Sequence, residues 1–342
     1  MSDGRGPDGV LNVLKPPGMT SHDVVAQIRR RLPRRTKVGH AGTLDPAAAG
    51  VLVVMAGRAT RLSDWLMNRP KHYRAEITFG IETDSADAEG AVTARQPAQV
   101  TQDETAAALP GFTGLITQTP PATSAVKVEG VPLHRRVRRG EEVTVPSRQV
   151  RIDEIVIRQW CPDARHPSCL LDIRCGRGTY IRSLARDLGR ALGTVACLTF
   201  LLRLSVGSMK VDEAVTLENL VPDAGSGPDW WTPRLIPPAQ AVNFLPGLVL
   251  PQQDVRAVVH GRSITSAYDS AGRFENGWVL EPFAAGAPEA DAAVGRLETL
   301  RLLDSRGALV AIARPEHRAD GLRRSLAVKP LRVLADAQEF DS

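Results

Sequence analysis

A glycine-rich segment holds the aspartate with the clearest potential for chemistry. Residues 39–50 contain three glycines, and within them Asp45 is followed directly by Pro46. A proline disfavours the helical conformation in the residue before it, so the Asp45 carboxylate should lie on an extended or turning backbone. Glycines let a backbone pass close to a ligand, and a carboxylate there could act as a nucleophile or a general base. An Asp-Pro pair alone is also typical of a structural turn, so this pattern leaves both interpretations open.

Metal and thiol chemistry find less support in the sequence. Asp84, Asp87 and Glu89 are close enough to suggest a cation site, but turn residues are the simpler interpretation, and we predict no metal. The four cysteines form no C-x-x-C pair and fit no standard zinc motif, which favours free thiols in a reducing compartment. The chain has neither an apolar run long enough to span a membrane nor a signal-peptide pattern, so we expect a cytoplasmic protein.

Hydrophobic periodicity predicts the elements that must position these residues. The expected strands in the first two thirds of the chain are 10–14, 51–55, 73–79 and 170–175, and the expected helices are 21–32 and 180–192. Strand 73–79 alternates cleanly and places Tyr73 on its apolar face, while the second helix carries Arg182 in its first turn. Taken singly, these could be an ordinary core tyrosine and a solvated helix arginine.

A second, smaller domain is predicted after a stretch rich in Pro, Gly and Asp at 221–240. Regularly spaced short strands beyond it indicate a small β-barrel. They are expected at 255–259, 278–280, 297–303, 309–313 and 326–333, with a mobile loop at 284–295. We therefore predict an α/β (α+β mixed sheet) protein that consists of a disordered tail (1–8), a catalytic domain (9–232), a linker (233–247), a barrel domain (248–336) and a tail (337–342).

The charge balance permits an acidic partner. The 342 residues carry a net charge of +5 and a pI of about 9.3, as expected for a protein that binds nucleic acid. Nearly all basic residues are arginines, which suit bidentate phosphate contacts and stacking on bases. A GC-rich genome would produce the same excess, so composition alone does not identify the partner.

Five segments resemble, in order, the motifs of the TruB family of pseudouridine synthases. They are GVLNVLKPPGMTSHDVV (9–25), KVGHAGTLDPAAAGVLVV (37–54), KHYRAEITFGIETDSADAEG (71–90), PPATSAVKVEG (120–130) and CGRGTYIRSLARDLGRALG (175–193). The tail resembles the small RNA-binding PUA domain at HGRSI (260–264) and VKPLRVL (328–334). The sequence departs from the family at His134-Arg135, where Tyr-Glu is common, and at Leu202-Arg203, where Arg-Arg is usual.

The resemblance implies a pseudouridine synthase catalytic fold followed by a PUA-like β-barrel. It implies an isomerase that converts uridine 55 in the TΨC arm of elongator tRNAs to pseudouridine, by flipping the base out and exchanging a C–N for a C–C glycosidic bond. Such a reaction needs no redox step and no activated donor, so we expect no cofactor. The implied partner is tRNA, and the protein should act as a monomer without an obligatory protein partner.

The family motifs also assign roles to individual residues. Asp45 matches the catalytic aspartate, Tyr73 the active-site tyrosine, and Arg182 the arginine that pairs with that aspartate. Whether Asp45 acts as a nucleophile or as a base on the sugar stays open. The residues expected to bind substrate or RNA are His40, Gly42, Thr43, Leu44, Lys15, Asp87, Lys127, Tyr180 and Leu202.

Three alternatives remain at this stage. A guide-RNA-dependent relative would need partner proteins, whereas activity of the purified chain on free tRNA would exclude it. A non-catalytic tRNA-binding or folding protein would not need the set of Asp45, Tyr73 and Arg182. A hydrolase acting on the same glycosidic bond would release free uracil.

Overall fold

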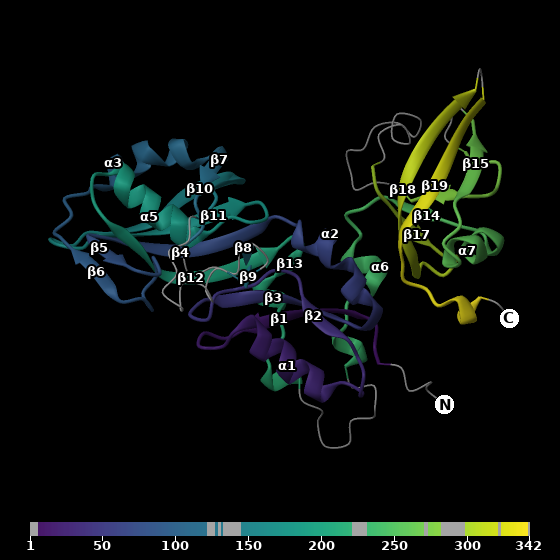
Figure 1. The fold of residues 1–342 in the computed structure, drawn as a ribbon, viewed down its shortest axis with the longest axis horizontal. Helices are drawn as coiled ribbons and strands as arrows, with labels where there is room; N and C mark the ends of the chain where they lie inside the picture. Colours follow the sequence, from purple (N-terminus) through teal and green to yellow (C-terminus); the bar gives the residue numbers. More distant parts are fainter. Residues whose placement is uncertain are drawn as a thin grey trace.

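The computed structural model describes residues 6–121, 127–128, 131–132, 145–220, 231–269, 273–281, 298–320 and 323–340. For 127–128, 131–132, 318–320, 323 and 338 it describes the backbone alone. The chain forms two parts, each built on a β-sheet, and the second follows the first in sequence (Figure 1).

The first part contains a mixed sheet with nine strands among the described residues. Its order is β1-β3-β12-β4-β11-β10-β7, with β2 paired to β3 and β13 paired to β12. The strands are β1 (Gly9–Lys15), β2 (Val38–His40), β3 (Ala49–Ala56), β4 (Lys71–Phe79), β7 (Gly114–Gln118), β10 (Arg148–Cys161), β11 (Ser168–Cys175), β12 (Ala196–Val206) and β13 (Met209–Lys210). Neighbours are antiparallel except β12 and β3, which are parallel. Two hairpins accompany the sheet: β5 (Ile81–Thr83) with β6 (Val92–Arg95), and β8 (Lys127–Val128) with β9 (Val131–Pro132).

Two amphipathic helices cover different halves of this sheet (Figure 1). Helix α1 begins at a capping box, in which Thr20 and Asp23 bond each other's backbone N–H, and it packs on β1 and β3. Helix α5 buries Leu184 and Leu188 against the apolar faces of β4 and β11. The helices of the whole chain are α1 (Ser21–Arg31), α2 (Ser63–Met67), α3 (Gln102–Ala108), α5 (Ile181–Ala191), α6 (Pro238–Ala241) and α7 (Gln252–Val259). Short 3-10 helices lie at Gly57–Leu62, Leu109–Phe112, Val211–Glu213, Glu218–Leu220, Thr232–Arg234 and Ala337–Glu339.

The second part is a six-stranded sheet in the order β15-β19-β18-β17-β14-β16. Its strands are β14 (Gly247–Val249), β15 (Ile264–Tyr268), β16 (Val279–Leu280), β17 (Leu300–Leu303), β18 (Leu309–Asp320) and β19 (Arg323–Val333). The strand predicted at 255–259 was wrong, because these residues lie in α7. Val255 and Val258 are buried three positions apart, which is helical spacing, and so short an apolar run does not distinguish a helix from a strand.

The two parts share an apolar cluster. Val10 and Val53 of the first sheet lie in one cluster with Leu309 and Leu334 of the second. Beside it, Arg58 forms ion pairs with Asp8 at 2.5 Å and with Glu339 at 3.1 Å. The predicted disordered tail was therefore too long at its inner end, because Asp8 is held by Arg58.

Two other expectations concern a loop and membrane spans. The mobile loop predicted at 284–295 lies outside the described residues. None of the helices in the described ranges is long and apolar enough to cross a membrane.

Candidate active site

The loop between β2 and β3 presents Asp45 on a backbone that is fixed on both sides. Before it, the Ser21 hydroxyl accepts a hydrogen bond from the Leu44 N–H at 2.9 Å and lies 3.0 Å from the Leu44 carbonyl. After it, the Pro46 carbonyl accepts bonds from the Gly18 N–H at 2.9 Å and from Lys15 Nζ at 3.0 Å. The carboxylate is therefore held by the fold before any ligand binds.

Lys15 has a structural role that corrects the prediction of an RNA contact. Its side chain is completely buried, and Nζ donates to the carbonyls of Pro16, Met19 and Pro46 at 2.8, 2.6 and 3.0 Å. These three bonds use all the donors of an ammonium group. Burial lowers the pKa of Lys15 to about 8. Lys15 thus fastens the loop around Asp45 and has no free donor for a phosphate.

Arg203 holds the other side of the same loop, a role that no local pattern in the sequence predicts. It is 1% exposed, and its guanidinium donates to the carbonyls of Val51 at 2.6 Å, Thr43 at 3.2 Å and Gly42 at 3.1 Å. Gly50 lies against the Arg203 backbone with φ +116°, where a Cβ atom would lie 2.3 Å from the Arg203 carbonyl oxygen. The close approach of β3 and β12 therefore requires glycine at this position.

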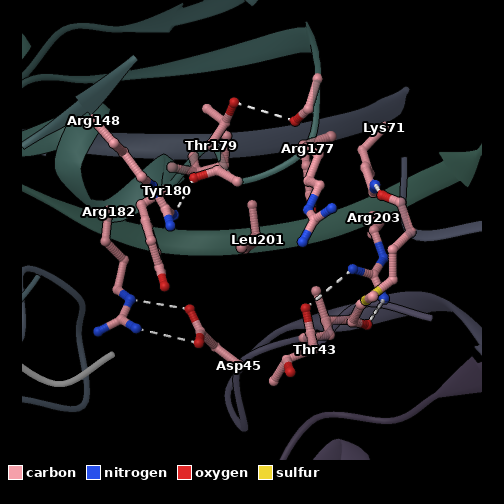
Figure 2. A pocket seen from close by; sticks show the side chains of 17 residues that line it. Thr43, Asp45, Lys71, Arg148, Arg177, Thr179, Tyr180, Arg182, Leu201 and Arg203 are labelled. Carbon is pink, nitrogen blue, oxygen red and sulfur yellow. Dashed lines mark hydrogen bonds and ion pairs between the residues drawn. The ribbon is translucent and has the colours of Figure 1, made fainter. Parts of the chain in front are cut away.

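The structure forms the aspartate–arginine pair that the sequence predicts. Arg182, in the first turn of α5, approaches both carboxylate oxygens of Asp45, with Nε 3.0 Å from Oδ2 and Nη2 3.2 Å from Oδ1 (Figure 2). The Arg182 side chain is only 6% exposed, whereas that of Asp45 is 34% exposed. A buried guanidinium thus orients a carboxylate that still faces the cavity.

Asp87, predicted to bind RNA, also contacts Arg182. Arg182 Nη1 donates to the Ser85 carbonyl at 3.1 Å and lies 3.4 Å from Asp87 Oδ2. Between Ser85 and Asp87, Ala86 has φ +59°, an uncommon backbone conformation for a residue other than glycine. The turn after β5 therefore directs Asp87 toward the arginine of the catalytic pair.

Tyr73 lines the same cavity from β4 of the central sheet. It lies on β4 opposite Arg203 of β12 and is 8% exposed. Burial raises the pKa of its phenol, so the hydroxyl carries its proton at neutral pH. A neutral hydroxyl can donate or accept a hydrogen bond, and the ring offers an aromatic surface for a planar ligand.

These groups surround a cavity of about 410 Å³, within the usual range of about 300–1,000 Å³ for small-molecule sites. The described residues that line it are Gly42, Thr43, Leu44, Asp45, Met67, Lys71, Tyr73, Arg148, Gly176, Arg177, Gly178, Thr179, Tyr180, Ile181, Arg182, Leu201 and Arg203. The structure therefore brings the predicted Gly42, Thr43, Leu44 and Tyr180 together with the catalytic set. Lys71, Arg148 and Arg177 were missed, since isolated basic residues have no distinctive spacing.

Leu201, and not the predicted Leu202, lies at the cavity. Leu202 is opposite Arg74 of β4, and side chains that are directly opposite share a face. Arg74 directly follows Tyr73, so it points away from the cavity. Two irregularities in the register of β12, at Leu198/Phe200 and Arg203/Ser205, change which residues face inward, and simple alternation cannot anticipate them.

Two further predicted RNA-binding residues are not part of the described lining. His40, at the end of β2, is partly buried, and its ring centroid lies 6.4 Å from that of His22. Burial lowers the pKa of His40, so its ring is uncharged at neutral pH. The side chain of Lys127 and residues 134–135 lie outside the part that the structure describes.

Three of the four described cysteines are buried and one, Cys161, is partly exposed. Burial raises the pKa of Cys175 and of Cys197 to about 11, so these thiols are protonated and unreactive at neutral pH. Over the described ranges, no group of three or more His, Cys, Asp or Glu residues is arranged to hold a metal ion.

Comparisons with known proteins agree with this site. Residues 29–181 match the family model described as TruB family pseudouridylate synthase (N terminal domain). The chain is 43% identical over 328 residues to tRNA pseudouridine synthase B of Moorella thermoacetica, covering 95% of this chain and 99% of the relative. The chain belongs to the TruB family. It is also 46% identical over 255 residues to the enzyme of that name from Symbiobacterium thermophilum, covering 74% and 82% of the two chains.

Solved structures agree over both parts of this TruB-family chain. A chain in a Cbf5-Nop10-Gar1 complex superposes with a TM-score of 0.68 and 25% identity, covering 98% of this chain and 87% of that chain. An archaeal box H/ACA Nop10-Cbf5 complex gives a TM-score of 0.66 and 26% identity, with 98% and 88% covered. The predicted fold, a pseudouridine synthase domain of mixed α/β structure with a PUA-like β-domain after it, is confirmed.

Proposed function

We propose that this TruB-family protein isomerises uridine 55 in the TΨC arm of elongator tRNAs to pseudouridine, with Asp45 acting on the flipped-out nucleotide. The observation that carries the proposal is a carboxylate 34% exposed to the cavity, held at both oxygens by the buried Arg182 and facing Tyr73. The curated relatives that cover most of the chain are named tRNA pseudouridine synthase B, which supports the same substrate.

The reaction rearranges bonds within one nucleotide. The N1–C1′ bond of uridine breaks, the uracil rotates, and a C5–C1′ bond forms while C5 loses a proton and N1 gains one. No atom is added, so the chain's own residues can carry the chemistry. Asp45 either attacks as a nucleophile or removes a sugar proton, and both routes use the carboxylate that the Arg182 guanidinium orients. The Tyr73 ring would stack on the uracil, and its hydroxyl would relay the C5 proton, accepting it while passing its own phenolic proton on to solvent.

The target base must leave its stack to enter the cavity, which costs a few kcal/mol. His40, beside the catalytic loop, is our candidate for holding the flipped nucleotide. Gly42, Thr43, Leu44 and Tyr180 would contact it within the cavity. Lys127 would contact RNA from the segment between β7 and β10.

The domain roles, location and partners follow from this proposed function. We propose that residues 9–232 carry the chemistry and that 248–336 bind RNA, joined by 233–247. The protein would act in the cytoplasm on free tRNA as a monomer, without cofactor or obligatory protein partner. The solved structures that resemble this chain are complexes with partner proteins. The guide-RNA-dependent alternative is therefore also tested.

The test uses the purified full-length chain, unmodified tRNA transcript and primer extension after carbodiimide treatment to map pseudouridine. A stop at position 55, absent with Asp45→Asn, would support the proposal. A chain that binds tRNA without modifying it would favour the binding or folding alternative. Activity that requires added guide RNA and partner proteins would favour the guide-dependent alternative, and free uracil would indicate a hydrolase.

A further inference from the structure

The helix that carries Arg182 does not cap its own N-terminus. The N-cap residue of α5 is Tyr180, whose side chain makes no capping hydrogen bond. The first N–H groups of a helix have no partner within the helix, so they must find one elsewhere or in water. Because Arg182 is only two residues beyond Tyr180, whatever holds Tyr180 also sets the position of the catalytic arginine.

Gln118, at the end of the edge strand β7, holds the backbone of this N-cap residue. Its side chain is 2% exposed and bonds both backbone groups of Tyr180: Oε1 accepts from the Tyr180 N–H at 2.9 Å, and Nε2 donates to the Tyr180 carbonyl at 3.0 Å. The next residue, Thr119, accepts bonds at its carbonyl from Ser183 Oγ at 2.8 Å and from Arg186 Nη2 at 3.1 Å. The start of α5 is therefore held by four hydrogen bonds to two consecutive residues of another element.

Arg148 holds the side chain of the same tyrosine. It is the direct cross-strand partner of Gln118 in the β7–β10 ladder. Its guanidinium carbon lies 4.7 Å from the centroid of the Tyr180 ring, and Nη2 donates to the Gly178 carbonyl. A cation over an aromatic face is attracted by the ring quadrupole. Figure 2 shows Arg148 beside Tyr180, with Tyr180 and Arg182 extending toward Asp45 from the same side of the cavity.

We propose that Gln118 and Arg148 are positioning residues for the isomerisation, which fix residues 178–180 and thereby set the geometry of Arg182 against Asp45. Neither residue needs to touch the reacting atoms. A misplacement of about 1 Å in an active site can lower the rate about a hundredfold, so a backbone support two residues from Arg182 should affect the chemical step. The inference rests on the proposed function and deepens it.

The first experiment measures the single-turnover rate at saturating unmodified tRNA for Gln118→Leu. The substitution keeps the volume of the side chain and removes both bonds to Tyr180. We expect the rate to fall about 10- to 100-fold while the tRNA Kd changes less than about threefold. Gln149→Leu is the matched control, since Gln149 is an exposed glutamine adjacent to Arg148 on β10, and we expect no change.

A double-mutant cycle separates positioning from general stability. If Gln118 acts through Arg182, its substitution should cost less than about twofold in rate in an Arg182→Lys background, while its effect on Tm stays the same. An equal fold-loss in both backgrounds would show a merely structural role and overturn the proposal.

Two milder variants cover the case in which Gln118→Leu does not fold. Gln118→Glu keeps an acceptor for the Tyr180 N–H and loses the donor to its carbonyl, and Arg148→Met keeps an apolar stem over the ring and loses the charge. Each should lower the rate about 3- to 10-fold with an unchanged Kd. Unchanged rates in both folded variants would refute the proposal, whereas an inactive wild-type protein would refute the proposed function instead.

Discussion

Two aspartate–arginine networks lie on opposite faces of the central sheet, and the exposure of their partners is reversed. At the cavity, the Asp45 side chain is 34% exposed and Arg182 is 6% exposed. On the other face, Asp172 is 5% exposed, while Arg74 and Arg158 are 39% and 51% exposed. The arginine is therefore the buried partner at the cavity, whereas the aspartate is the buried partner on the other face.

The difference indicates which carboxylate is free to react. Asp172 accepts bonds at both oxygens from Arg74, at 2.8 and 2.9 Å, and a further bond from Arg158 at 2.6 Å. The Arg74 bonds hold the pKa of Asp172 below its usual value. Asp45, in contrast, shares its arginine with Asp87 and keeps part of its surface open to the cavity. Asp172 is enclosed by arginines and stabilises the sheet. Asp45 is paired with a buried arginine and stays accessible to a substrate.

The largest effect is expected for Asp45→Asn. The amide is nearly isosteric but can neither attack the nucleotide nor accept a sugar proton, so the rate should fall by about 10²- to 10⁴-fold. Binding of tRNA should survive, because it rests on backbone and basic contacts elsewhere. Single-turnover assays and filter binding check both parts. Residual activity within about tenfold of wild type would contradict the role of Asp45.

A smaller but still large loss is expected for Tyr73→Phe. The ring and its packing on β4 remain, while the hydroxyl that would take the C5 proton is lost, so the rate should fall about a hundredfold at an unchanged Tm. Normal turnover would limit the residue to stacking. An unfolded variant would mean that the hydroxyl is needed by the core.

Asp172→Asn tests the other side of the comparison. Its two arginines are partly exposed and can be hydrated, so we expect a loss of only about 1–3 kcal/mol in the free energy of unfolding. The single-turnover rate at saturating tRNA should stay within about twofold of wild type. Urea unfolding and the rate assay together check this, and a rate loss as large as that of Asp45→Asn would remove the distinction between the networks.

The smallest effect, on the pH dependence of stability, is expected for Lys15. This buried cation is hydrogen-bonded to backbone carbonyls and not to a carboxylate. Its pKa is about 8 in the folded protein against 10.5 as the ordinary value. The folded state therefore binds fewer protons than the unfolded state between these pH values, and the stability rises with pH across this window. Between pH 7.5 and 9.5, wild type should gain about 1–2 kcal/mol relative to Lys15→Met.

Lys71 also has a pKa of about 8, but it is present in both proteins and cancels in this comparison. Urea unfolding at the two pH values provides the measurement. If the free energies of unfolding of wild type and Lys15→Met changed equally with pH, Lys15 Nζ would keep its proton over this range and the lowered pKa would be contradicted.

The sequence predicted the parts of the site that follow local rules. The alternation of β4 placed Tyr73, and the periodicity of α5 placed Arg182 in its first turn. It failed where tertiary contacts override residue type. Lys15 is polar in type yet completely buried, because three carbonyls from two segments of the chain, 16–19 and Pro46, converge on it.

The exchange of Leu202 for Leu201 has a different cause. Leu202 was expected from the family motif at 202–203, whereas the pairing of β12 with β4 places its neighbour Leu201 at the cavity. The contact between Asp87 and Arg182 was not predicted, because Arg182 is 95 positions away and on another element. Family motifs identified these residues as members of the site, but only the fold shows which of them face each other.

The apolar cluster shared by the two parts has a consequence for synthesis of the chain. Val10 emerges from the ribosome 324 residues before Leu334, which lies in the same cluster. At roughly 5–20 residues per second, the first strand waits about 15–60 s for its last apolar neighbours. During that interval one side of the first sheet is without part of its apolar cover, so we expect slower translation to lengthen the exposure of that surface.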